Sequence, residues 1–311
     1  MSSIKTQAAP QGAATWGASK KRRTPTGLIL PAIVFLFLVT QLPFLLTIFF
    51  SLRSWNLLRP DLPQEWVGLE NYKSLISDGT LLAAMRNTLV FTGAVVVLSL
   101  LLGLGLALLV NRPFPGRGIV RTLLITPMLI MPVVGALVWK NMMLHPVYGA
   151  VPWALSKFGI QEVDVLAQNP MMGVVGISVW QWTPFMMLVL LAGLSSVDET
   201  TLEAARIDGA SRWHEFWYVV LPHLSSYATV AVLLGTLFLL PTFDTLYVAT
   251  GGGPGFATTN LAYAVYKIAF ANYDVGLSSA LGLINAVFSL AVCFILIRVI
   301  GRIFARGEVL Q

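Results

Sequence analysis

The chain has 311 residues, of which 56% are apolar and only 11% are charged, and its formal net charge is +6. Soluble domains are about 45–50% apolar and about 25% charged, so this composition excludes a soluble enzyme, a disordered protein and a disulfide-stapled scaffold. We interpret the positive charge as the orientation signal of a membrane protein rather than as a nucleic-acid-binding surface. The single Cys293 has no partner for an internal disulfide.

Six long stretches of the chain contain no Asp, Glu, Lys or Arg. A helix that crosses the bilayer needs about 20 mostly apolar residues, which predicts six such helices at residues 27–52, 87–110, 122–139, 170–194, 224–243 and 275–297. Every backbone group in lipid must be paired, so continuous apolar runs predict helices, and a barrel would show short alternating segments instead. The predicted fold class is an all-α, polytopic membrane protein with six transmembrane helices and a cytoplasmic helix–elbow–helix loop between the fourth and the fifth.

Orientation follows from the distribution of lysine and arginine. With the N-terminus inside, 13 of the 20 basic residues lie on the inner side, which favours both termini in the cytoplasm. The first apolar run is too long for a secretory signal and is interpreted as a retained helix. We therefore expect a flexible basic cytoplasmic tail over residues 1–26, a transmembrane domain over 27–300, and a cytoplasmic tail over 301–311.

The predicted spans offer no energy source of their own. Proton-driven carriers commonly place acidic residues or histidine within the bilayer, and the predicted spans contain no charged residue there. No Gly-Lys pair occurs, so the phosphate-binding loop of ATPases is absent. Uphill transport would therefore need energy from another protein, although a sodium-coupled carrier that uses hydroxyls and carbonyls remains an alternative.

The connection between the fourth and fifth spans is the most informative stretch. Ser196 and Glu199 have the spacing of a capping box, which predicts a helix start. Gly209 is able to end that helix by turning with a positive φ. A second short helix is predicted from Ser211, and Pro222 follows it before the next span.

The second of these helices would place Trp213, Phe216, Trp217 and Val220 on one face. One interpretation is an amphipathic hairpin that rests on lipid headgroups. Five acidic residues outnumber two arginines between residues 198 and 215, however, and an anionic membrane surface would repel that balance. Docking against a soluble protein therefore fits better.

This loop resembles a known family motif. Residues Glu203-Ala204-Ala205, Gly209 and Val219-x-Leu221-Pro222 resemble the EAA loop of ABC-importer permeases, with Val in place of the usual Ile at 219, over residues 198–222. The run from Glu203 to Trp213 is similar to the carbohydrate-uptake branch. That similarity extends over most of residues 27–300 and includes Val67–Tyr72, Asn87–Leu89 and Thr250–Pro254. The chain resembles the first permease of maltose systems and also resembles polyol and trehalose permeases, and the resemblance does not separate these.

The resemblance implies a non-catalytic permease subunit of an ATP-driven importer in the bacterial cytoplasmic membrane. It implies a heterodimer with a second permease, two copies of an ABC ATPase, and an extracytoplasmic solute-binding protein that delivers a sugar, oligosaccharide or polyol. ATP and Mg would be bound by the ATPase and no cofactor by this chain, which would contact membrane lipid and no nucleic acid. The residues implied in ATPase coupling are Glu203, Ala204, Ala205, Asp208, Gly209, Trp213, Phe216, Leu221 and Pro222.

Solute contacts are expected where polar groups alternate with aromatic rings, the composition typical of sugar sites. The candidates are Gln181, Trp182, Phe238, Phe243, Asp244, Tyr247 and Asn285. Helix packing and an interfacial aromatic belt are the structural alternative for each of them.

Two other classes of protein compete with the importer hypothesis. A secondary carrier or facilitator of small polar solutes would work without an ATPase. A membrane enzyme would need a catalytic or metal-binding arrangement, and the three histidines are scattered without ligand spacing.

Overall fold

The computed structural model describes residues 26–160 and 164–308, and these residues form helices and no named strand. Residues 1–45 and 46–311 form two separate compact units, and each is described by itself. Helix α1 (Thr26–Ser51) begins in the first unit, and its residues there are mostly apolar on every face, as a helix in contact with lipid requires. Most of the predicted tail at 1–26 and the last three residues lie outside the described residues.

Four long helices in the second unit match predicted spans. These are α3 (Thr80–Asn111), α8 (Pro170–Ser195), α11 (Leu221–Leu239) and α14 (Val275–Glu308). With α1, they give five continuous helices in the described residues that are long and apolar enough to cross a bilayer. The prediction of an all-α, polytopic membrane protein is confirmed.

The third predicted span, 122–139, is wrong as a continuous helix. The chain forms α4 (Arg117–Leu129), then α5 (Pro132–Val138) and η1 (Trp139–Met143), with a bend of 101° at the break. Pro132 disfavours helical backbone in the residue before it, and Ile130 and Met131 are extended, with ψ of 133° and 135°. A sixth span exists only if this bent pair is counted as one.

Helix α8 occupies the centre of the second unit. In its most apolar window 67% of residues are buried, against 33% in α3 and 11% in α14. The main core packs α8 against α3 and α11 through Phe91, Ile177, Met186 and Leu239. Gly103 allows a close contact between α3 and α8, because a methyl group there would lie 2.8 Å from the Met186 Cβ.

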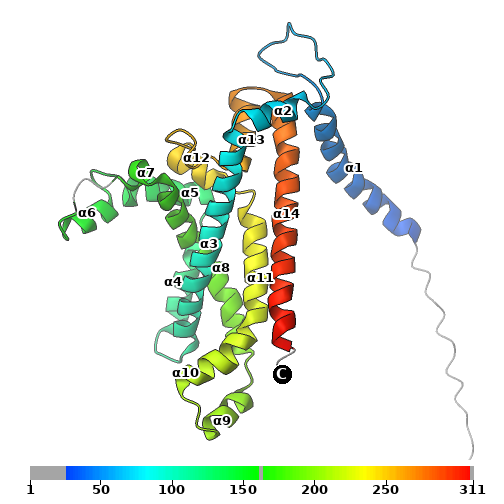
Figure 1. The fold of residues 1–311 in the computed structure, drawn as a ribbon. Coiled ribbons are helices and arrows are strands. Elements are labelled where there is room, and N and C mark those ends of the chain that lie inside the picture. The colour runs from blue at the N-terminus through cyan, green and yellow to red at the C-terminus, as the bar shows by residue number, and fades with distance from the viewer. Residues whose placement is uncertain (1–25, 161–163, 309–311) are drawn as a thin grey trace, which may run out of the picture. The chain divides into compact units, whose positions relative to one another are not determined.

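The connections of the second unit gather at two opposite ends (Figure 1). One end, here called the elbow end, holds α9 (Glu199–Ile207), α10 (Arg212–Glu215) and η2 (Phe216–Val220), and the C-terminal end of α14 points toward it. The opposite end holds α2 (Glu70–Ser77), α6 (Ala150–Ser156), α7 (Val165–Gln168), α12 (Asp244–Thr250), α13 (Leu261–Tyr266) and η3 (Lys267–Ala271). This grouping agrees with the predicted alternation of loops between the two sides of a membrane.

Motif residues outside the elbow hold the opposite end together. Asn71 donates through Nδ2 to the carbonyl oxygens of Ser51 and Arg53, at 2.8 and 2.9 Å. Buried Asn87 donates in the same way to Phe256 and Thr259, at 2.7 and 3.0 Å. The segment that follows the glycine-rich loop is therefore held by a side chain of α3.

Candidate functional site

The elbow, residues 198–222, begins with a capped helix. The Asp198 carboxylate accepts a hydrogen bond from the backbone N–H of Thr200 at 3.0 Å and from its hydroxyl at 2.8 Å. These bonds lower the pKa of the exposed Asp198. Helix α9 therefore starts at Glu199 behind an aspartate cap, and the predicted start at Ser196 is wrong.

Gly209 ends α9 and makes the turn that the sequence predicts. Its φ is +85°, in the left-handed region that side-chain-bearing residues rarely adopt. The N–H of Gly209 donates to the Arg206 carbonyl at 3.1 Å, and the N–H of Ala210 donates to the Ala205 carbonyl at 2.9 Å. This pair of bonds is a Schellman motif, which satisfies the last carbonyl groups of the helix.

The second arm of the elbow runs directly into the fifth span. Ser211 caps α10 by accepting from the backbone N–H of His214, as predicted. The arm does not stop at Pro222, because α10, η2 and α11 form one helical stretch from Arg212 to Leu239. The wider π-turn of η2 ends at Val220, two residues before Pro222, which cannot donate a backbone hydrogen bond of its own. The second arm is therefore joined to α11 without an intervening loop.

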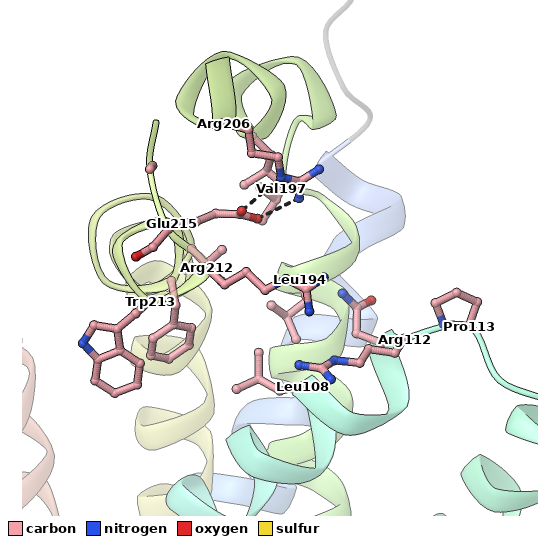
Figure 2. A pocket seen from close by; sticks show the side chains of 15 residues that line it. Leu108, Arg112, Pro113, Leu194, Val197, Arg206, Arg212, Trp213 and Glu215 are labelled. Carbon is pink, nitrogen blue, oxygen red and sulfur yellow. Dashed lines mark hydrogen bonds and ion pairs between the residues drawn. The ribbon is translucent and has the colours of Figure 1, made fainter. Parts of the chain in front are cut away.

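An ion pair joins the two arms and was not found from the sequence. Arg206 on α9 donates through Nε and Nη2 to the two carboxylate oxygens of Glu215 on α10, at 3.1 and 2.9 Å (Figure 2). The hydrogen bond from Arg206 lowers the pKa of Glu215, and the same bond raises the pKa of Arg206. The two-point geometry fixes the orientation of one arm against the other.

Most of the predicted coupling residues lie on the surface of the elbow. Glu203, Ala204, Asp208 and Pro222 are exposed, whereas Ala205, Phe216 and Leu221 are partly buried. Trp213, Phe216 and Trp217 pack against one another, with ring centroids 5.6 to 6.4 Å apart. Trp213 and Trp217 remain 67% and 46% exposed, which leaves an aromatic surface open to a partner or to lipid.

The base of the elbow is closed by contacts between α8 and α11. The Ser196 hydroxyl lies 2.9 Å from His223 Nε2 and 2.8 Å from the Tyr227 hydroxyl. Gly193 provides the space for this crossing, because a methyl group there would lie 2.7 Å from two ring carbons of Tyr227. The elbow therefore connects two helices, α8 and α11, that pack closely at its base.

The predicted pathway residues form separate groups. Trp182 stacks on Phe238 at a centroid distance of 6.1 Å, and both line a cavity of about 370 Å³ with Gln181. The Gln181 amide donates through Nε2 to the Ile130 carbonyl in the α4–α5 break, at 2.9 Å. This bond uses one of the hydrogen-bonding positions of the amide, so Gln181 supports the broken helix as well as facing the cavity.

A second group lies at the end opposite the elbow. Phe243 stacks on Tyr266 at 5.2 Å, and Tyr247 contacts both Tyr263 and Tyr266. Tyr263 and Tyr266 were not among the predicted pathway residues, because they lie between the predicted fifth and sixth spans, where no helix was predicted; α13 places them beside α12. Asp244 is the first residue of α12, and its Oδ1 accepts from the backbone N–H of Thr245.

Asn285 lies apart on α14. Its Oδ1 is buried and, in the part of the chain that the structure describes, has no hydrogen-bond partner. An unpaired buried carbonyl oxygen costs free energy that a ligand or a partner subunit would recover.

Comparisons with known proteins agree with this architecture. Residues 97–307 match the family model described as "Binding-protein-dependent transport system inner membrane component". The trehalose transport system permease protein SugA of Mycobacterium tuberculosis is 33% identical, covering 93% of this chain and 92% of its own length. The trehalose/maltose transport system permease protein MalF of Thermococcus litoralis is 34% identical, covering 88% and 92%.

A solved structure supports the fold as well. One chain of a bacterial ABC transporter described as importing the polysaccharide alginate superposes with a TM-score of 0.74 at 24% identity, over 89% of this chain and 95% of that chain. Together with the family match, which covers more than half of the residues, the relatives establish what kind of protein this is. The chain belongs to the family of binding-protein-dependent transport system inner membrane components, the permease subunits of ABC importers.

Proposed function

We propose that this chain forms half of the translocation pathway of an importer for a sugar, oligosaccharide or polyol, and that it receives mechanical work from an ATPase subunit through the elbow. The observation that carries the proposal is the continuity of the second arm with the fifth span from Arg212 to Leu239. No loop separates the docking surface from the bilayer in this stretch, so displacement of the elbow would displace α11.

The substrate class rests on the relatives and on the composition of the pathway. Two of the relatives are named for trehalose or maltose transport. In this chain the Trp182–Phe238 stack lies beside the Gln181 amide in the cavity of about 370 Å³. Aromatic faces with a few fixed polar groups are the surface that carbohydrate rings bind.

The coupling partner is inferred from the elbow surface. Glu203 and Asp208 are exposed acidic groups on the first arm and at the turn, and Trp213 is an exposed aromatic residue on the second arm. Exposed ion pairs contribute little, about 0–1 kcal/mol, so we infer that the aromatic face and the shape of the turn provide much of the affinity. ATP and Mg²⁺ would be held by that ATPase, of which two copies would serve this chain and a second permease.

Orientation and partners complete the proposal. The elbow end would face the cytoplasm together with both termini, because the basic residues predominate on that side. The opposite end would receive the sugar from an extracytoplasmic binding protein. The alternative, a secondary carrier that works without an ATPase, does not account for a permease-type elbow.

The test is purification of the chain with its associated subunits, followed by an ATPase assay with the binding protein and candidate sugars. We expect an ATPase and a second permease to copurify, and ATP hydrolysis to rise with one sugar class only. Copurification of no ATPase, with sugar movement unaffected by nucleotide, would support the carrier instead.

A further inference from the structure

A large groove lies between the elbow and the ends of two spans. Its volume is about 1340 Å³, and its walls come from the C-terminal ends of α3 and α8 and from both arms of the elbow (Figure 2). Because α3 and α8 are apolar enough to cross the bilayer, the groove lies where these spans leave the membrane. Its ligands would therefore come from the membrane surface or from the adjacent solution.

The groove is basic even though the elbow as a whole is acidic. The charged residues among its lining residues are Arg112, Arg206, Arg212 and Glu215. Arg206 is neutralised by its two-point bond to Glu215. The other four acidic residues of the elbow do not line the groove, so the acidic charge is separated from this surface and two guanidinium groups remain.

The two remaining arginines, Arg112 and Arg212, come from different elements and line the same groove. Arg112 follows the end of α3, Arg212 begins α10, and the side chains of both point into the groove (Figure 2). Both residues are exposed. Two guanidinium groups that line one groove give it a positive charge, which attracts an anion.

The remaining lining is apolar. Leu108, Leu194, Phe216 and Val220 line the groove, and Trp213 lies at its edge with 67% of its surface exposed. A small soluble anion would gain nothing from this wall. A phospholipid carries both a phosphate group for the arginines and acyl chains for the leucines, and tryptophan is favoured at the membrane interface.

We propose that this groove is a binding site for an anionic phospholipid, with its phosphate held by Arg112 and Arg212 and its acyl chains along Leu108, Leu194 and Val220. Basic pockets between membrane helices on the cytoplasmic side bind anionic headgroups by the same chemistry. The bound lipid would connect the end of α3 to the second arm of the elbow. The proposal requires that α3 and α8 cross the membrane and does not depend on the identity of the sugar.

Native mass spectrometry of the purified importer complex, titrated with phosphatidylglycerol or phosphatidylcholine, tests the proposal. We expect phosphatidylglycerol to bind with a defined stoichiometry and phosphatidylcholine to bind far more weakly. Arg112→Gln and Arg212→Gln should each lower the affinity for phosphatidylglycerol about fivefold, the factor expected for one basic residue at an anionic membrane surface. Arg112→Lys should retain most of the affinity.

The matched control is Arg86→Gln, which removes one exposed charge from the other end of α3 and should leave the affinity unchanged. Size-exclusion chromatography of each variant checks that the complex is intact. Unchanged phosphatidylglycerol binding by the intact double variant Arg112→Gln/Arg212→Gln would overturn the proposal. Full competition by inorganic phosphate at equal concentration would also overturn it, because the site would then recognise the phosphate alone.

Discussion

The Arg206 guanidinium binds both carboxylate oxygens of Glu215 across the turn at Gly209, with N–O distances of 3.1 and 2.9 Å. The two residues are nine positions apart, and the bonds join α9 to α10. Together with the turn at Gly209, this pair constrains the angle between the two arms.

Breaking the ion pair should loosen the elbow without unfolding the membrane helices. We expect Arg206→Gln or Glu215→Gln to reduce sugar-stimulated ATP hydrolysis while the basal rate and the yield of complex stay unchanged. The double variant should be no worse than either single variant, because both remove the same contact. Additive losses would show that the two residues act separately.

The pair also predicts a pH dependence. The pKa of Glu215 is lower in the folded chain than in the unfolded chain, chiefly through the hydrogen bond from Arg206. Its stabilising contribution is therefore fully present above the unfolded pKa of glutamate and is lost as the pH falls through the lower, folded value. Thermal unfolding of the detergent-solubilised chain should show a gap between the native chain and Glu215→Gln that closes as the pH falls below the usual range of glutamate. A gap that widens at acid pH would contradict this assignment.

The effect of a substitution at Gly209 should depend on how readily the new residue adopts a positive φ. A Cβ at this position meets no heavy atom within 4 Å, so the cost is conformational, about 1–2 kcal/mol for an ordinary L-residue. Gly209→Asn should be the mildest change and Gly209→Ala intermediate. Gly209→Pro should abolish transport, since it fixes φ near −65° and removes the N–H that donates to Arg206.

These variants are compared by sugar uptake at equal membrane abundance. Normal uptake by Gly209→Pro would show that coupling does not require the turn at Gly209.

Reversing the charge at Glu203 tests the docking surface itself. Glu203 is exposed on α9, so Glu203→Lys should leave membrane insertion intact and abolish uptake. Glu199→Lys is the control, because it makes the same change one turn earlier on the same helix. Copurification of the ATPase with each variant separates loss of docking from loss of a later step, and an equal effect of both variants would argue for a general charge effect.

The packing of α8 on α11 offers a stability test with an internal control. Gly193→Ala would place a methyl group 2.7 Å from the Tyr227 ring, and overpacking of this kind costs about 1–3 kcal/mol. Gly176→Ala on the same helix meets nothing within 4 Å and should be neutral or slightly stabilising. Thermal unfolding in detergent compares the two variants. Equal melting temperatures would mean that α8 and α11 shift apart to accommodate the added methyl group.

Much of this architecture could be predicted from charge-free runs alone, because a bilayer permits few alternatives to long apolar helices. The bend after Leu129 could not, since Pro127 and Pro132 are also compatible with a kinked but continuous span. The Arg206–Glu215 pair was hidden because the turn at Gly209 brings together residues that no helical spacing relates. Gln181 was predicted to contact solute, but only the fold places its amide against the Ile130 carbonyl.

Reconstitution in sealed vesicles tests the central claim most directly. Labelled sugar accumulation is measured with this chain alone, and then with the second permease, the ATPase and the binding protein present. The account predicts accumulation only by the complete assembly and only with ATP, and its loss with Gly209→Pro. Accumulation of sugar against its gradient by this chain alone, without nucleotide, would contradict the account.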